Sequence, residues 1–82
     1  MYEPIFTKKS EKDFDSLTDE LKHRVIGVLE RIKINPKKYL KKLAGTNLYR
    51  LRIGDYRVIL DIDEKNKKLV CVRIGHRRNI YR

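Results

Sequence analysis

The sequence predicts an α+β fold in the order β-α-α-β-β-β, with a helical hairpin packed on one face of a small, mostly antiparallel sheet. Two observations predict this fold. Apolar residues recur at helical spacing before residue 35, and from residue 48 onward short runs of β-forming residues alternate with turn signals. At 82 residues, the chain is expected to form one domain over residues 1–82.

The first predicted elements are a strand and a helix. Residues 2–7 are predicted as a short edge strand, because Pro4 lacks the N–H that an inner strand would need. Thr7 is a good helix-capping residue, and it precedes a first predicted helix over residues 8–16.

A second helix is predicted to begin after Thr18, which caps it. Its apolar stripe consists of Leu21, Val25, Val28, Leu29 and Ile32. Asn35-Pro36 is expected to end this helix. The lysine-rich residues 37–45 that follow form either a loop or a short helical turn, and their lysines are most simply a solvated surface.

Residues 48–62 are predicted to form a β-hairpin around Gly54-Asp55, a two-residue turn signal. The opposed pairs are then Ile53 and Tyr56, Arg52 and Arg57, and Leu51 and Val58. Side chains alternate along a strand, so one face is apolar and carries Tyr49, Leu51, Ile53, Tyr56, Val58 and Leu60. The opposite face, called the arginine face below, carries Arg50, Arg52 and Arg57. Directly opposed like charges disfavour folding, which indicates an anionic ligand for this face.

A last strand is predicted from Leu69 to Ile74. If Val70, Val72 and Ile74 face the helices, Arg73 and Arg77 join the arginine face, with Tyr81 nearby. Five guanidinium groups would then converge on one surface. Guanidinium groups match phosphate oxygens, and an aromatic ring can stack on an unpaired base. This combination favours single-stranded RNA over duplex DNA as the ligand.

The composition limits the partners and the chemistry. The 21 Lys and Arg residues against 11 Asp and Glu give a net charge of +10, which indicates nucleic acid, an acidic protein or an anionic membrane surface, or serves only solubility. One cysteine, Cys71, excludes an internal disulfide and fits a buried thiol. Without a signal peptide or membrane-spanning run, the chain is expected to be cytoplasmic.

The candidates for proton transfer are few. One cysteine and two histidines cannot form a zinc site, and no metal or cofactor is expected. His76 is the one histidine close in sequence to the C-terminal arginines. It is assigned either to acid–base chemistry or to a phosphate contact. Arg73 and Arg78 are assigned as further RNA contacts, with pairing to a protein partner or exposure to solvent as the alternatives.

Three segments carry a resemblance to a known family: Tyr49-Arg50-Leu51-Arg52, Gly54-Asp55-Tyr56-Arg57-Val58-Ile59, and Ile74-Gly75-His76-Arg77-Arg78 followed by Tyr81. Together they resemble the RelE branch of the RelE/ParE toxin superfamily, and the lysine-rich, compact chain looks like an archaeal member. The resemblance implies a type II toxin that cuts mRNA in the ribosomal A site without metal. It acts by 2′-OH attack, and an acidic RelB-like antitoxin silences it in a hetero-oligomer.

The resemblance also implies roles for individual residues. Arg50 and Arg52 match the basic pair on the first hairpin strand, and Arg57 matches the arginine that stabilises the charged phosphorane. Arg77 matches the arginine proposed to assist the leaving 5′ oxygen, and Tyr81 matches the tyrosine that stacks on the nucleotide. The basic pair of the family is often lysine, and arginine cannot act as a base. Tyr81 also lies closer to Gly75 than is usual.

Two other functions share these features. A toxin of the ParE branch would inhibit DNA gyrase by protein binding, without needing Arg57, Arg77 and Tyr81 together. A non-catalytic RNA-binding module would need only the positive charge. Codon preference, the antitoxin binding mode and the identity of the general base are not determined by the sequence.

Overall fold

The computed structural model describes residues 1–79, and its order of elements agrees with the predicted β-α-α-β-β-β fold. Two short elements, α3 and β2, are added between the second helix and the hairpin. In chain order the elements are β1 (Glu3–Phe6), α1 (Lys8–Asp15), α2 (Asp19–Ile32), α3 (Pro36–Tyr39), β2 (Lys41–Lys42), β3 (Tyr49–Ile53), β4 (Tyr56–Asp63) and β5 (Lys68–His76).

The strands form one five-stranded sheet in the order β1-β5-β4-β3-β2. Only the pairing of β1 with β5 is parallel, and the other three pairings are antiparallel. The predicted edge strand over residues 2–7 is therefore confirmed as an edge of the sheet. The other edge belongs to β2, which pairs with only the first two residues of β3.

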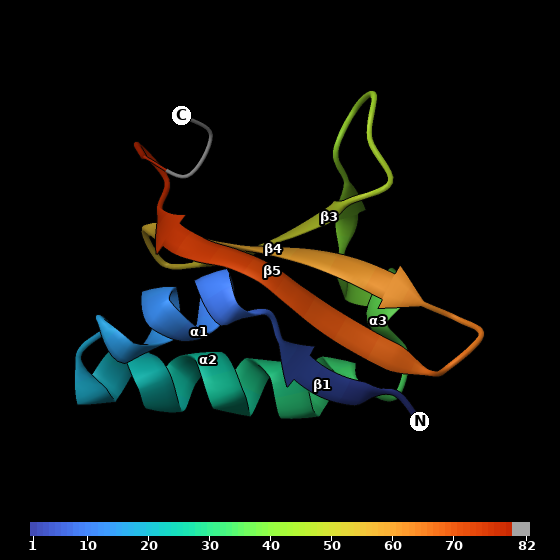
Figure 1. Ribbon diagram of the computed structural model, residues 1–82, viewed down its shortest axis with the longest axis horizontal. Coiled ribbons are helices and arrows are strands. Elements are labelled where there is room, and N and C mark those ends of the chain that lie inside the picture. The colour runs from blue at the N-terminus through green and yellow to red at the C-terminus, as the bar shows by residue number, and fades with distance from the viewer. Residues whose placement is uncertain (80–82) are drawn as a thin grey trace.

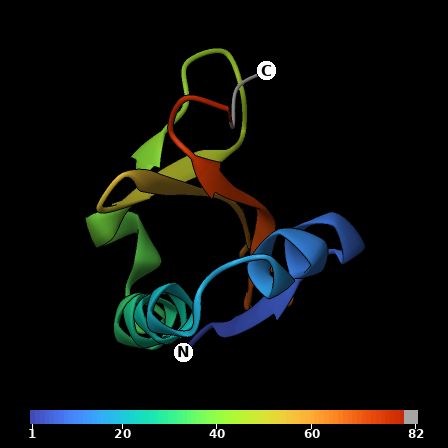
Figure 2. The same cartoon turned by 90° about the vertical axis from the view of Figure 1, so that its left-hand side faces the viewer.

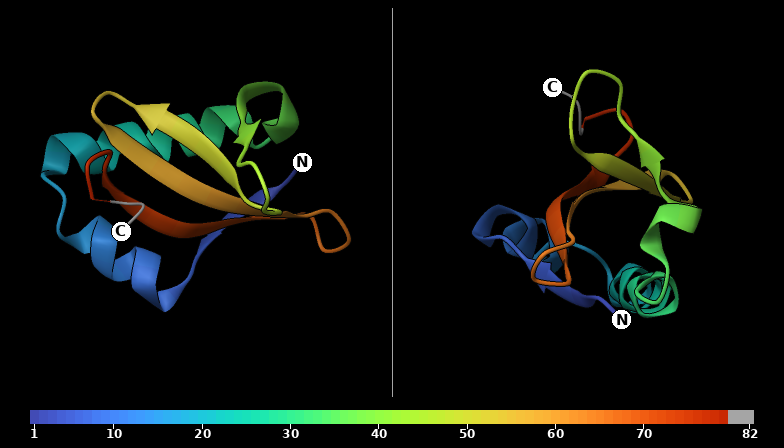
Figure 3. Two further views of the ribbon diagram at one scale, coloured as in Figure 1. Left: turned by 90° about the horizontal axis from the view of Figure 1, so that it is seen from above. Right: turned by 90° about the vertical axis from the view of Figure 1, so that its right-hand side faces the viewer.

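Helices α1 and α2 lie on the same side of the sheet (Figures 1 and 2), and they diverge from the connection between them (Figure 3). The capping predictions are confirmed, because Thr7 Oγ1 accepts from the Ser10 amide at 3.1 Å and Thr18 Oγ1 from the Leu21 amide at 3.3 Å. The core between helices and sheet consists of Val25, Leu29, Ile32, Leu40, Leu51, Ile53, Val58, Leu60, Leu69, Cys71 and Ile74. No helix within residues 1–79 is both long and apolar enough to cross a membrane.

The segment after α2 resolves the alternatives for residues 37–45. Helix α2 ends at Ile32, and Pro36 then occupies the first turn of α3, where its missing N–H costs nothing. Asn35-Pro36 thus separates two helices, and the chain returns to extended conformation at Leu40, with φ −102° and ψ 142°, to enter β2. The lysine-rich segment is a helical turn followed by a short strand.

The predicted orientation of β5 is right for Ile74 and wrong for Val70 and Val72, which do not belong to the core. The side chains that β5 buries in the core are Leu69, Cys71 and Ile74. Arg73 pairs with Ile59 and Cys71 pairs with Leu60, so Val72 has no opposite residue. This β-bulge shifts the alternation by one position and explains why Leu69 and Ile74 can both face the helices.

Side chains of α1 cover the edge of β5 beyond the end of β1. Strand β1 pairs with β5 only as far as Cys71. There the Ser10 hydroxyl, which is buried, donates to the Cys71 carbonyl at 2.7 Å. Three residues further along β5, the Asp13 carboxylate accepts from the Ile74 amide at 2.9 Å. The backbone groups of this edge are therefore satisfied by a helix rather than by another strand.

Candidate functional site

The hairpin turn sets the geometry of the arginine face. Gly54 has a φ of +59° and Asp55 does not have a positive φ, as in a type II′ turn with glycine in first position. The predicted register is confirmed: Ile53 pairs with Tyr56, Arg52 with Arg57 and Leu51 with Val58. Residues next to a two-residue turn form a hydrogen-bonded pair, so Arg52 and Arg57 form the following non-hydrogen-bonded pair, in which side chains lie closest.

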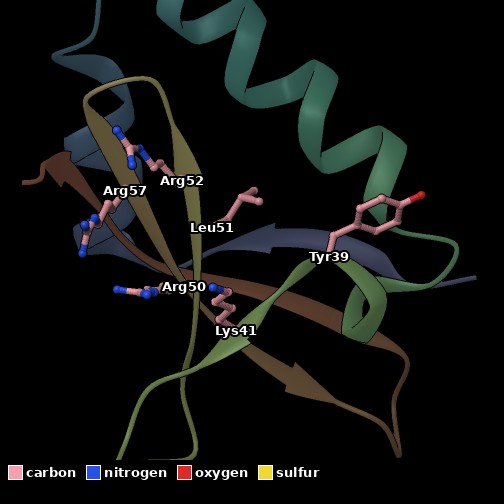
Figure 4. A pocket seen from close by; sticks show the side chains of 6 residues that line it. All are labelled: Tyr39, Lys41, Arg50, Leu51, Arg52 and Arg57. Carbon is pink, nitrogen blue, oxygen red and sulfur yellow. The ribbon is translucent and has the colours of Figure 1, made fainter.

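Arg50, Arg52 and Arg57 project from the side of the hairpin opposite Leu51 (Figure 4). Leu51 and Val58 are buried under the helices, so the three arginines lie on the sheet face that α1 and α2 leave uncovered. The connection between β2 and β3 and residues 77–79 after β5 both rise on this uncovered side (Figure 1). The arginine face therefore lies between two projecting segments.

A fourth cation joins the arginines from β2. Lys41 pairs with Arg50 across the β2–β3 ladder, so both side chains lie on the same face. Figure 4 shows Lys41 directed toward Arg50. A hollow of about 320 Å³ is lined by Tyr39, Lys41, Arg50, Leu51, Arg52 and Arg57. The sequence alone predicts a solvated surface for Lys41. The turn-forming residues 45–47 before β3 are the sequence signal that indicates its place in a hairpin.

Ile59 is an apolar residue in the middle of this charged face. It lies between Arg57 and Asp61 along β4, and it pairs with Arg50 on β3 and with Arg73 on β5. Although no helix covers this side, Ile59 is only 5% exposed. The aliphatic stems of long charged side chains can cover such a residue while their head groups stay in solvent.

Arg73 belongs to the arginine face by register, as predicted, but its head group lies elsewhere. Its Nε donates to Asp13 Oδ2 on α1 at 2.9 Å. The Asp13 side chain is 19% exposed and that of Arg73 is 35% exposed, so the pair is partly shielded from solvent. Arg73 does not line the hollow. The structure therefore brings together Arg50, Arg52 and Arg57, but not Arg73, from the five predicted arginines.

Arg77 follows the end of β5 and lies beside the hairpin turn. Its amide donates to the Asp55 carbonyl at 2.9 Å, which ties the backbone of the C-terminal segment to the turn. The Arg77 side chain is exposed and does not line the hollow. Arg78 is also exposed. Tyr81, the predicted stacking residue, lies outside the described residues.

His76 lies on the other side of β5 from Gly75 and Arg77. It pairs with Tyr56, and the two rings meet edge-on with centroids 5.5 Å apart and an interplanar angle of 75°. Its Nδ1 accepts from the Arg78 amide at 3.3 Å. The structure thus separates His76 from the arginine face by the thickness of the sheet.

Four cations outside the hollow have carboxylate partners. Ion pairs join Glu30 to Lys33, Glu64 to Lys37, Glu3 to Lys68 and Asp13 to Arg73. Within residues 1–79, Lys41, Arg50 and Arg52 make no such pair. Carboxylates of the same face, Asp61 and Asp63, lie at the far end of β4. The uncovered face is therefore positive near the hairpin turn and carries charges of both signs at its opposite end, where Asp63 pairs with Lys68.

This architecture, with two helices on one face of a five-stranded sheet, is that of the small toxins with a RelE-like fold. Residues 5–81 match the family described as the ParE toxin of type II toxin-antitoxin systems, parDE, and the chain belongs to this family. It is also 33% identical to Toxin RelG of Mycobacterium tuberculosis (strain ATCC 25618 / H37Rv), over 99% of this chain and 97% of that protein. The predicted membership of the RelE/ParE superfamily is confirmed.

Solved structures agree with this assignment. The RelBE2 toxin-antitoxin complex of Mycobacterium tuberculosis contains a chain that is 27% identical, with a TM-score of 0.79 over 93% of this chain and 98% of that one. The archaeal RelE-RelB complex of Pyrococcus horikoshii OT3 contains a chain that is 29% identical, with a TM-score of 0.78 over 95% and 97% of the two chains.

Proposed function

We propose that this protein is a metal-independent, ribosome-dependent endoribonuclease that cleaves mRNA in the A site and acts as the toxin of a type II system. The observation that carries the proposal is the hollow in which Arg50, Arg52 and Arg57 meet Lys41. Arg52 lies directly opposite Arg57, and a bound polyanion would lower the repulsion between such like charges. The RelE toxins to which the chain is similar support the same assignment.

The proposed reaction is an attack of the 2′ oxygen on the adjacent phosphorus. A 2′-O–P bond forms, the P–5′-O bond breaks, and a 2′,3′-cyclic phosphate remains. The phosphorane carries more negative charge than the substrate, so cations held in place before reaction stabilise it selectively. We assign this role to Arg57. Arg77 would assist the leaving 5′ oxygen, which takes up a proton as the bond breaks, and Tyr81 would stack on the nucleotide.

Arg50 and Arg52 are assigned to the developing charge on the 2′ oxygen. A guanidinium group can donate hydrogen bonds to that oxygen, but it cannot take its proton, because arginine stays protonated in proteins. The proton must therefore pass to another group or to water. Lys41 adds a fourth positive charge at the same hollow, and we assign it to binding a phosphate of the substrate. Arg78 is assigned to flanking RNA, whereas His76, which lies across the sheet with Tyr56, is left without a role at this face.

We further propose that an acidic, RelB-like antitoxin binds and inhibits the protein in the cytoplasm. The similar chains of the RelBE2 and RelE-RelB structures come from toxin-antitoxin complexes. A net charge of +10 favours an acidic partner, and such a partner would also stabilise the fold by mass action. Covering the arginine face would block access of mRNA.

The test is cleavage of a defined mRNA on programmed ribosomes in the presence of EDTA, with the Arg57→Ala variant as control. We expect cuts in the A-site codon of ribosome-bound mRNA and none in free mRNA. These cuts should persist in EDTA, and the Arg57→Ala variant should not produce them. Inhibition of gyrase supercoiling without RNA cleavage would replace this function with that of a ParE-type toxin. Ribosome or RNA binding without either activity would leave a non-catalytic RNA-binding module.

A further inference from the structure

The outer edge of β3 is only half covered. Strand β2 pairs with Tyr49 and Arg50, and before β2 the chain comes from α3 through Leu40, away from the sheet. Within residues 1–79, no strand pairs with the outer side of residues 51–53. The hollow of about 320 Å³ lies at this place, because its lining takes Leu51 and Arg52 from the open part of β3 and Tyr39 and Lys41 from the segment where the chain turns away.

The backbone of this edge is arranged to accept another strand. In the hairpin register, Ile53 and Leu51 form hydrogen-bonded pairs with β4, and Arg52 falls between them. The N–H and C=O of Arg52 therefore point away from β4, toward the hollow. Backbone groups at such an edge must bind water or a partner.

The side chains on the two sides of the edge differ in character. Figure 4 shows Lys41 and the arginines on one side of β3, and Leu51 and Tyr39 on the other. Tyr39 is 48% exposed, which is high for a large aromatic side chain. An added strand would place successive side chains on alternate sides. It would therefore need acidic residues at one parity and apolar residues at the other.

Two observations indicate what kind of strand could pair with the open edge of β3. The opposite edge strand, β1, contains Pro4, a residue that protects sheet edges because it has no N–H to offer. The open part of β3 contains no proline, so it remains able to pair. A second copy of this chain would bring two sets of arginines together at a net charge of +10 each, so self-pairing is disfavoured.

We propose that the open edge of β3 binds an extended acidic segment of a partner polypeptide, which adds a short strand beside residues 51–53. Main-chain hydrogen bonds to Arg52 would hold the segment, as in other cases of strand addition. Its acidic side chains would contact Lys41, Arg50 and Arg52, and its apolar side chains would contact Tyr39 and Leu51. The inference deepens the proposed antitoxin interaction and rests on it for the identity of the partner.

The test uses two synthetic peptides of equal composition, Glu-Val-Glu-Val-Glu and Glu-Glu-Glu-Val-Val, both blocked at their ends. Amide hydrogen exchange and chemical shifts of the full-length protein are followed by NMR at rising peptide concentration. The alternating peptide should slow exchange of the Arg52 amide several-fold and shift the Tyr39 ring signals. The block peptide should have a much smaller effect, because it cannot satisfy both sides of the strand.

Two variants of equal charge separate this edge from general electrostatic attraction. Arg52→Glu should abolish protection by the alternating peptide, whereas Lys9→Glu on the exposed side of α1 should retain it. The inference would be overturned if the two peptides had equal effects or if neither protected the Arg52 amide. It would also be overturned if a single-stranded oligoribonucleotide protected that amide more strongly than the alternating peptide. The NMR experiment does not measure RNA cleavage. Peptide binding at β3 could therefore be observed even if the protein did not cleave RNA, and RNA cleavage could be observed even if no peptide bound.

Discussion

Asp13 and Arg73 are joined by a hydrogen-bonded ion pair whose Oδ2–Nε distance is 2.9 Å, although 60 residues separate them in the chain. The same carboxylate oxygen accepts from the Ile74 amide at 2.9 Å. Asp13 therefore fixes both the direction of the Arg73 side chain and the edge of β5 just before the Gly75–Arg77 segment.

Replacing Asp13 should destabilise the fold. Asp13→Ala leaves the Ile74 amide without its acceptor at a partly shielded edge, so the free energy of unfolding should fall by about 1–3 kcal/mol. Asp13→Asn keeps an oxygen that can accept from this amide and should lose less. Urea unfolding followed by circular dichroism measures both variants. Equal stability of wild type and Asp13→Ala would show that the contact contributes nothing to the fold.

Arg73 and Arg57 should differ sharply in the ribosome cleavage assay. Arg57→Ala removes a cation from the hollow and should lower the cleavage rate by about 10²–10³. Arg77→Ala should have an effect of the same size if it assists the leaving group, and Arg50→Ala or Arg52→Ala a smaller one. Arg73→Ala should leave the rate within a few-fold of wild type, because Arg73 is directed to α1. A loss at Arg73 as large as that at Arg57 would contradict this division.

Tyr81 and His76 supply a second kinetic comparison. If Tyr81 acts by stacking, Tyr81→Phe should retain more activity than Tyr81→Ala. Because His76 lies across the sheet from the arginines, His76→Ala should change the cleavage rate little. A loss at His76 equal to that of Arg77→Ala would instead identify it as a proton-transfer group. Rates on programmed ribosomes measure all three variants.

Binding of a short single-stranded RNA should weaken steeply as salt rises, because each neutralised phosphate releases counterions. If Lys41 contacts a phosphate, Lys41→Met should reduce the slope of log K against log salt by about 0.7, the value for one contact to a single strand. Lys9→Met on α1 is the matched control and should leave the slope unchanged. Fluorescence anisotropy over a range of salt concentrations gives both slopes. Identical slopes for the two variants would exclude a phosphate contact at Lys41.

The single thiol should be unreactive in the folded protein. Cys71 is fully buried, and burial raises the pKa of its thiol to about 12. Only the thiolate reacts with alkylating agents and disulfides, so modification at pH 8 should be very slow. In urea the thiol should react at the rate of a free cysteine. Rapid reaction with a thiol reagent under native conditions would indicate that the β5 edge opens readily.

Local signals were sufficient for the hairpin and the two main helices. Gly54 fixes the turn type, and strict alternation then determines which residues share the arginine face. Thr7 and Thr18 mark helix starts through hydrogen bonds that span only three residues. Each of these features depends on neighbours in the chain, so a single sequence contains the information.

Features that depend on contacts between residues far apart in the sequence could not be predicted from local sequence patterns. The β-bulge at Val72 arises from the pairing of β5 with β4, and no residue type near it indicates an extra residue. Strand β2 consists of two lysines, which have little preference for strands and extend only because β3 lies beside them. The turn of Arg73 toward α1 depends on Asp13, far away in the chain.

The parallel pairing of β1 with β5 has a consequence for the order of events during synthesis. Glu3 lies opposite Lys68, 65 residues later, so the sheet cannot close until nearly the whole chain is available. Contacts of such long range slow folding, because a large loop must be closed before they form. The residues of β5 also come after the hairpin in the chain, so a nascent chain first has a hairpin without the strand that pairs with β4. A cell would therefore have an interval between translation of this chain and completion of its folded surface, during which a partner already present could bind first.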